Sequence, residues 1–171
     1  MYRLFLLRHA KAGWAAPGMT DFDRGLTASG IADARILGRR MRETGLVPDQ
    51  VLCSPARRAR ETCDHVLSSF SQPGPEPFFV DELYNSDATH YVDAIRAAAP
   101  ARSLLIVGHN PMMEDLAYAL PAGGDDRAMR LAAAGFPTCG LAVIRFERAL
   151  SDLMPGSGHL DDFLRPERVR Q

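Results

Sequence analysis

Arginine and histidine side chains recur at three separate points of the chain, in surroundings that suit the handling of an anion. Arg8 and His9 end the apolar run YRLFLL, the segment SPARRARET contains Arg58, and the segment VGHNP contains His109. The planar guanidinium group of arginine binds oxyanions through paired hydrogen bonds. An imidazole can act as a nucleophile, or as an acid or base near neutral pH. Together these residue types indicate a site that binds an anion and could act on it.

Each of these segments has a simpler explanation when it is considered by itself. A lone histidine after a strand is more often a structural hydrogen-bonding residue than a catalytic one. An arginine-rich first turn of a helix can face solvent without any function. The three segments together are hard to attribute to coincidence if they all reach the same edge of one sheet. The secondary-structure pattern decides whether they do.

Five short apolar runs have the character of buried strands, and they span residues 2–7, 50–53, 78–80, 103–107 and 141–146. Amphipathic patterns between and after these runs predict four helices. One begins near Thr27, and the others cover residues 59–70, 91–99 and 113–120. Asn110 is suited to cap the last of them, with Pro111 at its first helical position.

The order of these elements predicts the fold class. Residues 71–77 and 121–126 are rich in glycine, proline and polar residues, and we expect loops there. The alternation of strands and helices predicts an α/β three-layer sandwich, in which helices flank a mostly parallel central sheet. We expect one domain over residues 1–171. Ligands of such sheets bind outside the carboxyl ends of the strands. The three arginine and histidine segments follow three of the predicted strands, so we expect them to meet at one edge.

Composition excludes several classes of function. The chain has 171 residues, of which 46% are hydrophobic and 24% charged, and its net charge is −1. This balance argues against nucleic acid or a membrane surface as the main partner. The three cysteines are odd in number and lack metal-ligand spacing, which favours reduced thiols in the cytoplasm. The sequence has neither an apolar run of membrane-spanning length nor a signal-peptide pattern at its start. A cytoplasmic protein is therefore expected, and a monomer is compatible with the sequence.

Several motifs resemble those of the histidine phosphatase superfamily, whose fold is called phosphoglycerate-mutase-like. The segment LRHAKAG resembles its Arg-His-Gly or Arg-His-Ala signature. SPARRARET resembles its second motif, Ser-Pro-x-x-Arg-Ala-x-x-Thr, and VGHNP resembles the third. The segment DFDRGLTASG, residues 21–30, is similar to a stretch of the small bacterial SixA-like phosphohistidine phosphatases. The motifs follow one another in family order over most of the chain.

The resemblance implies a role for individual residues of this chain. His9 would be the nucleophile that becomes phosphohistidine. Arg8, Arg58 and His109 would hold the phosphoryl oxygens, with Arg24 in a supporting role in substrate binding. Ala10 stands where many members have glycine, which we interpret as a mark of the small branch. No metal and no other cofactor would be required, because the arginines neutralise the phosphoryl charge.

Electrostatics agrees with this assignment. His9 must attack as a neutral imidazole, and nearby arginine charges favour that form by like-charge repulsion. His109 would add a further hydrogen-bond donor if it were protonated. A general acid is needed only where the leaving group is a strong base such as an alkoxide. The segment VDELYNS offers Glu82 for that task, although a solvated surface carboxylate is an equally good interpretation.

Two other phosphatase patterns occur in the sequence and are rejected. The aspartates of DFD, residues 21–23, resemble those of metal-dependent aspartyl phosphatases, but no strand precedes them. Cys139 and Arg145 have the Cys-x5-Arg spacing of cysteine phosphatases. The residues between them favour a strand, and six extended residues span about 20 Å, far too long for a phosphate loop.

The expected function is a phosphatase that forms phosphohistidine on His9 and acts on phosphohistidine in a protein. A phosphatase of small phosphomonoesters is the main alternative. A non-catalytic module that binds phosphoprotein is less favoured, because it would not need a nucleophilic histidine at the strand end. Phosphoglycerate mutases of this type carry long insertions over the pocket, for which this chain is too short.

Overall fold

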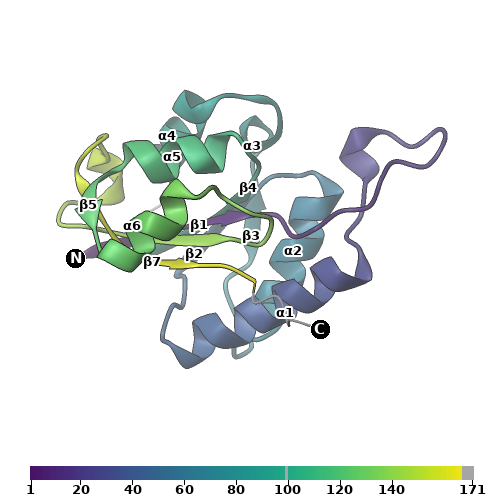
Figure 1. Cartoon of the computed structure of the whole chain (residues 1–171), viewed down its shortest axis with the longest axis horizontal. Helices are drawn as coiled ribbons and strands as arrows, with labels where there is room; N and C mark the ends of the chain where they lie inside the picture. Colours follow the sequence, from purple (N-terminus) through teal and green to yellow (C-terminus); the bar gives the residue numbers. More distant parts are fainter. Residues whose placement is uncertain (99, 167–171) are drawn as a thin grey trace.

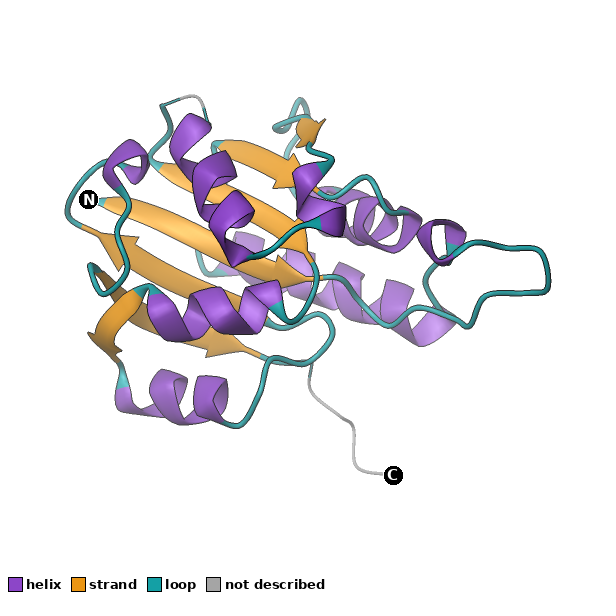
Figure 2. Ribbon diagram, turned by 90° about the horizontal axis from the view of Figure 1, so that it is seen from above, coloured by secondary structure: helices purple, strands orange, loops and turns teal. Residues whose placement is uncertain are grey.

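A seven-stranded sheet forms the centre of the computed structural model, which describes residues 1–98 and 100–166 (Figures 1 and 2). Its spatial order is β3-β2-β4-β1-β6-β7-β5. The strands are β1 (Tyr2–Arg8), β2 (Gln50–Cys53), β3 (Pro77–Phe79), β4 (Ser103–Gly108), β5 (Pro121–Gly124), β6 (Leu141–Phe146) and β7 (Gly158–Leu164). All five strands expected from the sequence are present, with ends shifted by at most one residue.

The sheet is mostly parallel, as predicted, and the antiparallel contacts all involve β6. Strands β3, β2, β4 and β1 are parallel neighbours, and β5 is parallel to β7. Strand β6 runs antiparallel to both β1 and β7. The carboxyl ends of β1, β2 and β4 therefore lie at the same edge of the sheet.

Helices cover both faces of the sheet, which confirms the three-layer architecture. They are α1 (Ala28–Glu43), α2 (Arg57–Leu67), α3 (Glu82–Asn85), α4 (Ala88–Ala97), α5 (Met112–Ala119) and α6 (Asp126–Ala133), with the short 3-10 helices η1 (Asp21–Asp23) and η2 (Leu150–Asp152). Helices α1 and α2 lie on one face, and α4, α5 and α6 lie on the other (Figure 1).

Alternation along the central strand explains why it is apolar throughout. Leu4 and Leu6 belong to the core beneath α4, α5 and α6, whereas Phe5 and Leu7 belong to the core beneath α1 and α2. Successive side chains of a strand point to opposite faces, so a strand covered on both sides is hydrophobic at every position. All four side chains are fully buried.

The helix boundaries differ from the expected ones where capping decides them. Thr27 caps α1 as predicted, and its side chain accepts a hydrogen bond from the N–H of Gly30. Helix α4 begins at Ala88, earlier than expected, because the side chain of Asp87 caps it; residue 99 of the predicted helix lies outside the described residues. Helix α5 has Pro111 at its N-cap and begins at Met112, so the predicted cap at Asn110 was wrong by one residue.

The C-terminal third contains elements that the sequence did not reveal. The expected loop at 121–126 is wrong: Pro121–Gly124 forms β5, and Asp126 begins α6. The strand exists because β7 pairs with it, and the missing side chain of Gly124 lets it approach the backbone of Leu160 closely. Tertiary pairing here overrides a local preference for turns.

Two general features of the chain bear on the expectations about its environment. Within residues 1–98 and 100–166, no helix is long and apolar enough to cross a membrane. Cys53, Cys63 and Cys139 are all buried, and each is a free thiol in the described part of the chain. The prediction of one domain over residues 1–171 stays a prediction, and residues 167–171 lie outside the described ranges.

Candidate active site

The register between β1 and β4 brings two histidines together at the carboxyl edge of the sheet. Arg8 is aligned with Gly108, so His9 and His109 are the residues that follow in the two neighbouring strands. The backbone N–H of His9 donates to the carbonyl of Gly108 at 3.0 Å. The centroids of the two imidazole rings are 5.2 Å apart. His9 and His109 therefore lie close together at one edge of the sheet, as the order of the strands predicts.

The imidazole of His9 is held in one tautomer by its own backbone. Its Nδ1 atom lies 2.8 Å from the carbonyl oxygen of Ala10. A carbonyl oxygen only accepts, so Nδ1 carries the hydrogen and Nε2 keeps its lone pair. The pKa of His9 is lowered to about 4, mainly by burial and also by the charges of Arg58, Arg8 and Arg24, against the raising effect of the hydrogen bond to Ala10. His9 is therefore a neutral imidazole at pH 7, with Nε2 free to attack.

The second histidine is also neutral and also held by a neighbour. Its Nε2 atom lies 2.8 Å from the hydroxyl oxygen of Ser54, which follows β2. Burial lowers the pKa of His109 to about 3, with His9 and Arg58 as further causes. The protonated donor considered from the sequence is therefore not the state of the free protein.

A donor on His109 is nevertheless available through the other ring nitrogen. The hydroxyl oxygen of Ser54 accepts from the N–H of Ala56 at 3.3 Å, so its own hydrogen can be donated to Nε2 of His109. Nδ1 then carries the ring hydrogen. Among the described residues, this Nδ1 is buried and has no hydrogen-bond partner. An unpaired buried donor beside His9 suits the oxygen of a bound phosphoryl group.

The backbone at His109 is supported from the α4 side of the sheet. The hydroxyl of the buried Tyr91 accepts from the N–H of His109 at 3.2 Å and donates to the carbonyl of Leu83. A side chain at Gly108 would not fit here, because its Cβ would lie 2.5 Å from the Tyr91 oxygen. The glycine before His109 is thus required by close packing.

Three arginines surround the histidines, and each of them contributes to the lowered pKa of His9. Arg8 donates from Nη1 to the carbonyl of Phe136 at 2.9 Å, while its buried Nε has no partner among the described residues. Arg58, whose side chain is only 9% exposed, donates to the backbone oxygen of Asp21 at 2.9 Å. Arg24 donates from Nε to the carbonyl of Gly13 at 3.0 Å. These contacts leave further N–H groups for a ligand.

The two adjacent arginines of the second motif point in different directions. Arg58 reaches the histidines, whereas Arg57 forms an exposed ion pair with Glu61 at 2.7 Å. The alignment that selects Arg58 agrees with this placement. On the same helix, the hydroxyl of Thr62 accepts from the N–H of Ala10 at 2.9 Å. Helix α2 thereby supplies both a charge and a backbone support to the site.

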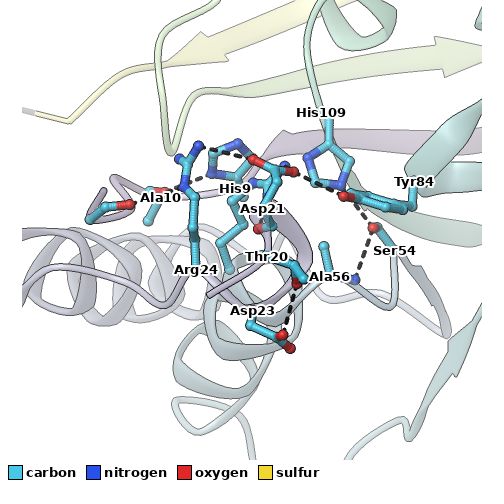
Figure 3. Close-up of polar contacts among 12 residues, drawn as sticks. His9, Ala10, Thr20, Asp21, Asp23, Arg24, Ser54, Ala56, Tyr84 and His109 are labelled. Carbon is cyan, nitrogen blue, oxygen red and sulfur yellow. Dashed lines mark hydrogen bonds and ion pairs between the residues drawn. The ribbon is translucent and has the colours of Figure 1, made fainter. Parts of the chain in front are cut away.

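Asp21 and Tyr84 also belong to the site, and the sequence did not identify either (Figure 3). The carboxylate of Asp21 contacts Arg24 at 3.1 Å and Arg58 at 3.2 Å. The Tyr84 hydroxyl donates to the same carboxylate at 2.9 Å, and its ring packs against His109 with centroids 5.7 Å apart. Asp21 precedes Arg24 by one helical turn, which is the one signal that could have indicated it.

Glu82, the general acid expected from the sequence, is not among these contacts. It is exposed at the start of α3, and within the described residues its carboxylate makes no hydrogen bond or ion pair. The carboxylate that contacts the site arginines is that of Asp21. The role of Glu82 as a general acid therefore stays a prediction, and the residue of the segment VDELYNS that contacts the site is Tyr84.

The two rejected phosphatase patterns have no counterpart in the structure. Asp21 and Asp23 lie in the short helix η1, not at the end of a strand. The residues between Cys139 and Arg145 include the start of β6, as expected, and Arg145 pairs with Asp161 at 3.1 Å. Burial raises the pKa of the Cys139 thiol to about 12, so it is no nucleophile at neutral pH.

Comparison with known proteins places this arrangement in a family. Residues 4–79 match the profile of the histidine phosphatase superfamily, branch 1. An uncharacterized protein of Mycobacterium tuberculosis is 33% identical over 160 residues, which cover 92% of this chain and 98% of that protein.

Solved structures of similar proteins extend the match to the whole fold. A candidate phosphohistidine phosphatase, SixA, from Agrobacterium tumefaciens is 38% identical, with a TM-score of 0.80 over 96% of this chain and 98% of that chain. A candidate phosphohistidine phosphatase SixA from Nakamurella multipartita is 25% identical, with a TM-score of 0.82 over 96% of each chain.

Proposed function

Because the chain belongs to the histidine phosphatase superfamily, we propose that it is a phosphatase whose nucleophile is His9 and whose substrate is phosphohistidine in a protein. The observation that supports this most strongly is the state of His9. It is buried, neutral and held by Ala10 so that its Nε2 lone pair is free. A pocket that only bound phosphoprotein would need the arginines but not this nucleophile.

In the proposed first step, Nε2 of His9 attacks the phosphorus atom of the substrate. A nitrogen–phosphorus bond forms while the bond to the leaving group breaks, and the leaving atom keeps the electron pair. The transition state spreads negative charge over three oxygens. Arg8, Arg58 and the Nδ1–H of His109 are the donors that would stabilise it, with Arg24 in support. No metal ion is needed for this charge neutralisation.

In the second step, water attacks the phosphorus of phosphorylated His9. The nitrogen–phosphorus bond breaks, phosphate leaves, and His9 returns to a neutral imidazole. The Nδ1–H to Ala10 bond is available throughout, so the ring is oriented in the same way in both steps. Dividing one difficult displacement into two easier ones is the usual advantage of covalent catalysis.

The choice of phosphohistidine as substrate rests on the acid that the leaving group needs. An alkoxide is a strong base, and proton donation to it is worth about 10²- to 10⁴-fold in rate. Among the described residues, the carboxylate that contacts the site arginines is Asp21, and the hydroxyl of Tyr84 and the charge of Arg58 lower its pKa against the opposing effect of burial. It is ionised at neutral pH and offers no proton. An imidazole protonated at its second nitrogen leaves as a neutral molecule and needs none.

A substrate panel at neutral pH tests the proposal. Purified protein would be assayed with a phosphohistidine-containing protein, an aryl phosphate and an alkyl phosphate, each in the presence of a chelator. We expect the highest kcat/KM for phosphohistidine, an intermediate value for the aryl phosphate and the lowest for the alkyl phosphate. Highest activity on alkyl phosphates would replace this proposal with a general phosphatase of small molecules. Activity that needs added metal would contradict the proposed mechanism.

A further inference from the structure

The carboxylate of Asp21 lies at the entrance of the candidate site, beside the groups proposed to bind phosphate. Its side chain is 54% exposed, yet it contacts the guanidinium groups of both Arg24 and Arg58. Figure 3 shows it between the side chains of Arg24 and Tyr84, with His9 and His109 close by. Its charge also acts on His109, whose pKa it raises against the larger lowering effects of burial, His9 and Arg58. The site is therefore not purely cationic.

A bound phosphoryl group would have this negative charge as a neighbour. The guanidinium of Arg58 has five N–H groups, of which Asp21 takes one through its backbone oxygen and one through its carboxylate. The others remain for phosphoryl oxygens, so Asp21 need not leave when phosphate binds. A carboxylate in this position repels an anionic leaving group and attracts a cationic one.

The leaving group must depart on the side of the pocket that faces solvent. In-line attack by His9, at the buried end, places the leaving atom opposite the nucleophile. His9 is 8% exposed whereas the side chain of Asp21 is 54% exposed, so Asp21 lies on the outer side of the site. The carboxylate and the leaving group therefore share the entrance.

We propose that Asp21 is the specificity-determining residue of this site and selects substrates whose leaving group bears a positive charge. This inference rests on the proposed function. In phosphohistidine, the carboxylate accepts a hydrogen bond from the N–H of the imidazole nitrogen that is not phosphorylated. When Nε2 of His9 bonds to phosphorus, the substrate phosphorus–nitrogen bond breaks and its electron pair stays on the leaving nitrogen. The ring keeps its N–H and departs as neutral imidazole, without proton transfer from the protein.

The variant Asp21→Asn isolates the charge of this side chain. It keeps the shape and one oxygen acceptor, which the Tyr84 hydroxyl can still use. Asp23→Asn is the matched control. Asp23 belongs to the same short helix and is also exposed, but its carboxylate accepts from the hydroxyl of Thr20 at 2.8 Å rather than from an arginine.

The experiment compares leaving groups that differ in charge. The substrates are a phosphohistidine peptide and three alkyl phosphates: phosphoethanolamine with an ammonium group, glycerol phosphate without further charge, and 3-phosphoglycerate with a carboxylate. We expect Asp21→Asn to lower kcat/KM about tenfold for the phosphohistidine peptide and for phosphoethanolamine, as one charge-assisted hydrogen bond is lost. We expect 3-phosphoglycerate to gain severalfold and glycerol phosphate to change little. Single-turnover labelling of His9 gives the same ratios where turnover is slow.

Other outcomes overturn the inference in recognisable ways. Equal losses on all four substrates would show that Asp21 only positions Arg58. A loss that is greatest for glycerol phosphate would make Asp21 a general acid. The same changes in Asp23→Asn would show that the effect comes from the net charge of the protein and not from the position of Asp21. If the unaltered protein fails on phosphohistidine, the proposed function fails, while the three alkyl phosphates still test charge selection by Asp21.

Discussion

The hydroxyl of Thr62 on helix α2 accepts a hydrogen bond from the backbone N–H of Ala10 at 2.9 Å, and the carbonyl of Ala10 orients the ring of His9. Thr62 also donates to the carbonyl of Arg58, so its hydroxyl acts as both acceptor and donor. Ala10, which orients the ring of His9, is thus held in place by helix α2, the helix that also carries Arg58. The family motif contains this threonine, and the structure gives it a physical task.

Thr62→Val should therefore weaken both stability and catalysis. Valine keeps the shape but leaves the buried N–H of Ala10 without an acceptor, which costs about 1–3 kcal/mol of unfolding free energy. We expect kcat to fall while KM changes little, because the phosphate-binding groups remain. Urea denaturation and steady-state kinetics would measure the two effects. Thr62→Ser, which keeps the hydroxyl, should restore both, and failure to do so would contradict this account.

His9→Ala should abolish turnover on every substrate. Brief incubation of the unaltered protein with labelled substrate, followed by rapid quenching, should place the label on a nitrogen of His9. Such a bond is acid-labile and alkali-stable, so peptide mapping at high pH would locate it. Full activity in His9→Ala, or a label at another residue, would rule out the proposed nucleophile.

Arg58→Ala should lower kcat/KM by about 10²-fold or more, as expected for a preorganised charge donor. Arg8→Ala should have a similar effect. Arg57→Ala is the matched control, because Arg57 lies next in sequence but pairs with Glu61 on the exposed side of α2. We expect less than a threefold change for it, in line with the small contribution of an exposed ion pair. A reversed ranking would mean that the second motif has been aligned one residue off.

Stability should fall as the pH drops from about 6.5 towards 4. The pKa of His9 is lowered to about 4 and that of His109 to about 3, mainly by burial. In the unfolded chain both titrate near pH 6.5, so below this pH the unfolded state binds protons that the folded state does not. The free energy of unfolding is therefore highest above pH 6.5 and falls as the pH drops. Between pH 6.5 and 4, the contribution of His9 to this loss is about 3 kcal/mol.

Urea denaturation at several pH values between 7 and 4.5 would measure this slope. His109→Gln should give a shallower slope, because one of the two buried histidines no longer titrates. Since His9 remains neutral well below pH 7, kcat/KM should not decline between pH 8 and pH 6 through protonation of His9. A slope that is unchanged in His109→Gln would contradict the assignment of the effect to this residue.

Glu82 remains the candidate general acid for ester substrates. Glu82→Gln should lower the hydrolysis of alkyl phosphates more than that of phosphohistidine, with aryl phosphates between them, because the need for an acid follows the basicity of the leaving group. Comparison of kcat across the three substrate types would measure the difference. Equal losses for all three would show that Glu82 supports the fold or binding. No change at all would agree with its exposed position at the start of α3.

The apolar strands and the polar residues that follow them could be predicted from the sequence. A strand covered on both faces must be hydrophobic at every position, so a polar residue after an apolar run marks the end of a strand. Arg8 and His9 mark the end of β1 in this way, and His109 marks the end of β4. Parallel strands then bring those ends to one edge. The same logic failed for β5, because a strand made of proline, alanine and glycine has no apolar pattern and forms only through its partner β7.

The motifs that contain Arg8, His9, Arg58 and His109 indicated phosphoryl chemistry through their resemblance to the family, and these residues lie at the ends of regular elements that the sequence predicts. The surroundings of the phosphate-binding groups depend instead on loops whose paths no local pattern determines. Asp21 and Tyr84 are 63 residues apart and meet only because η1 and α3 pack beside the same arginine. The neutral state of both histidines likewise comes from burial, which arises when the complete chain is packed.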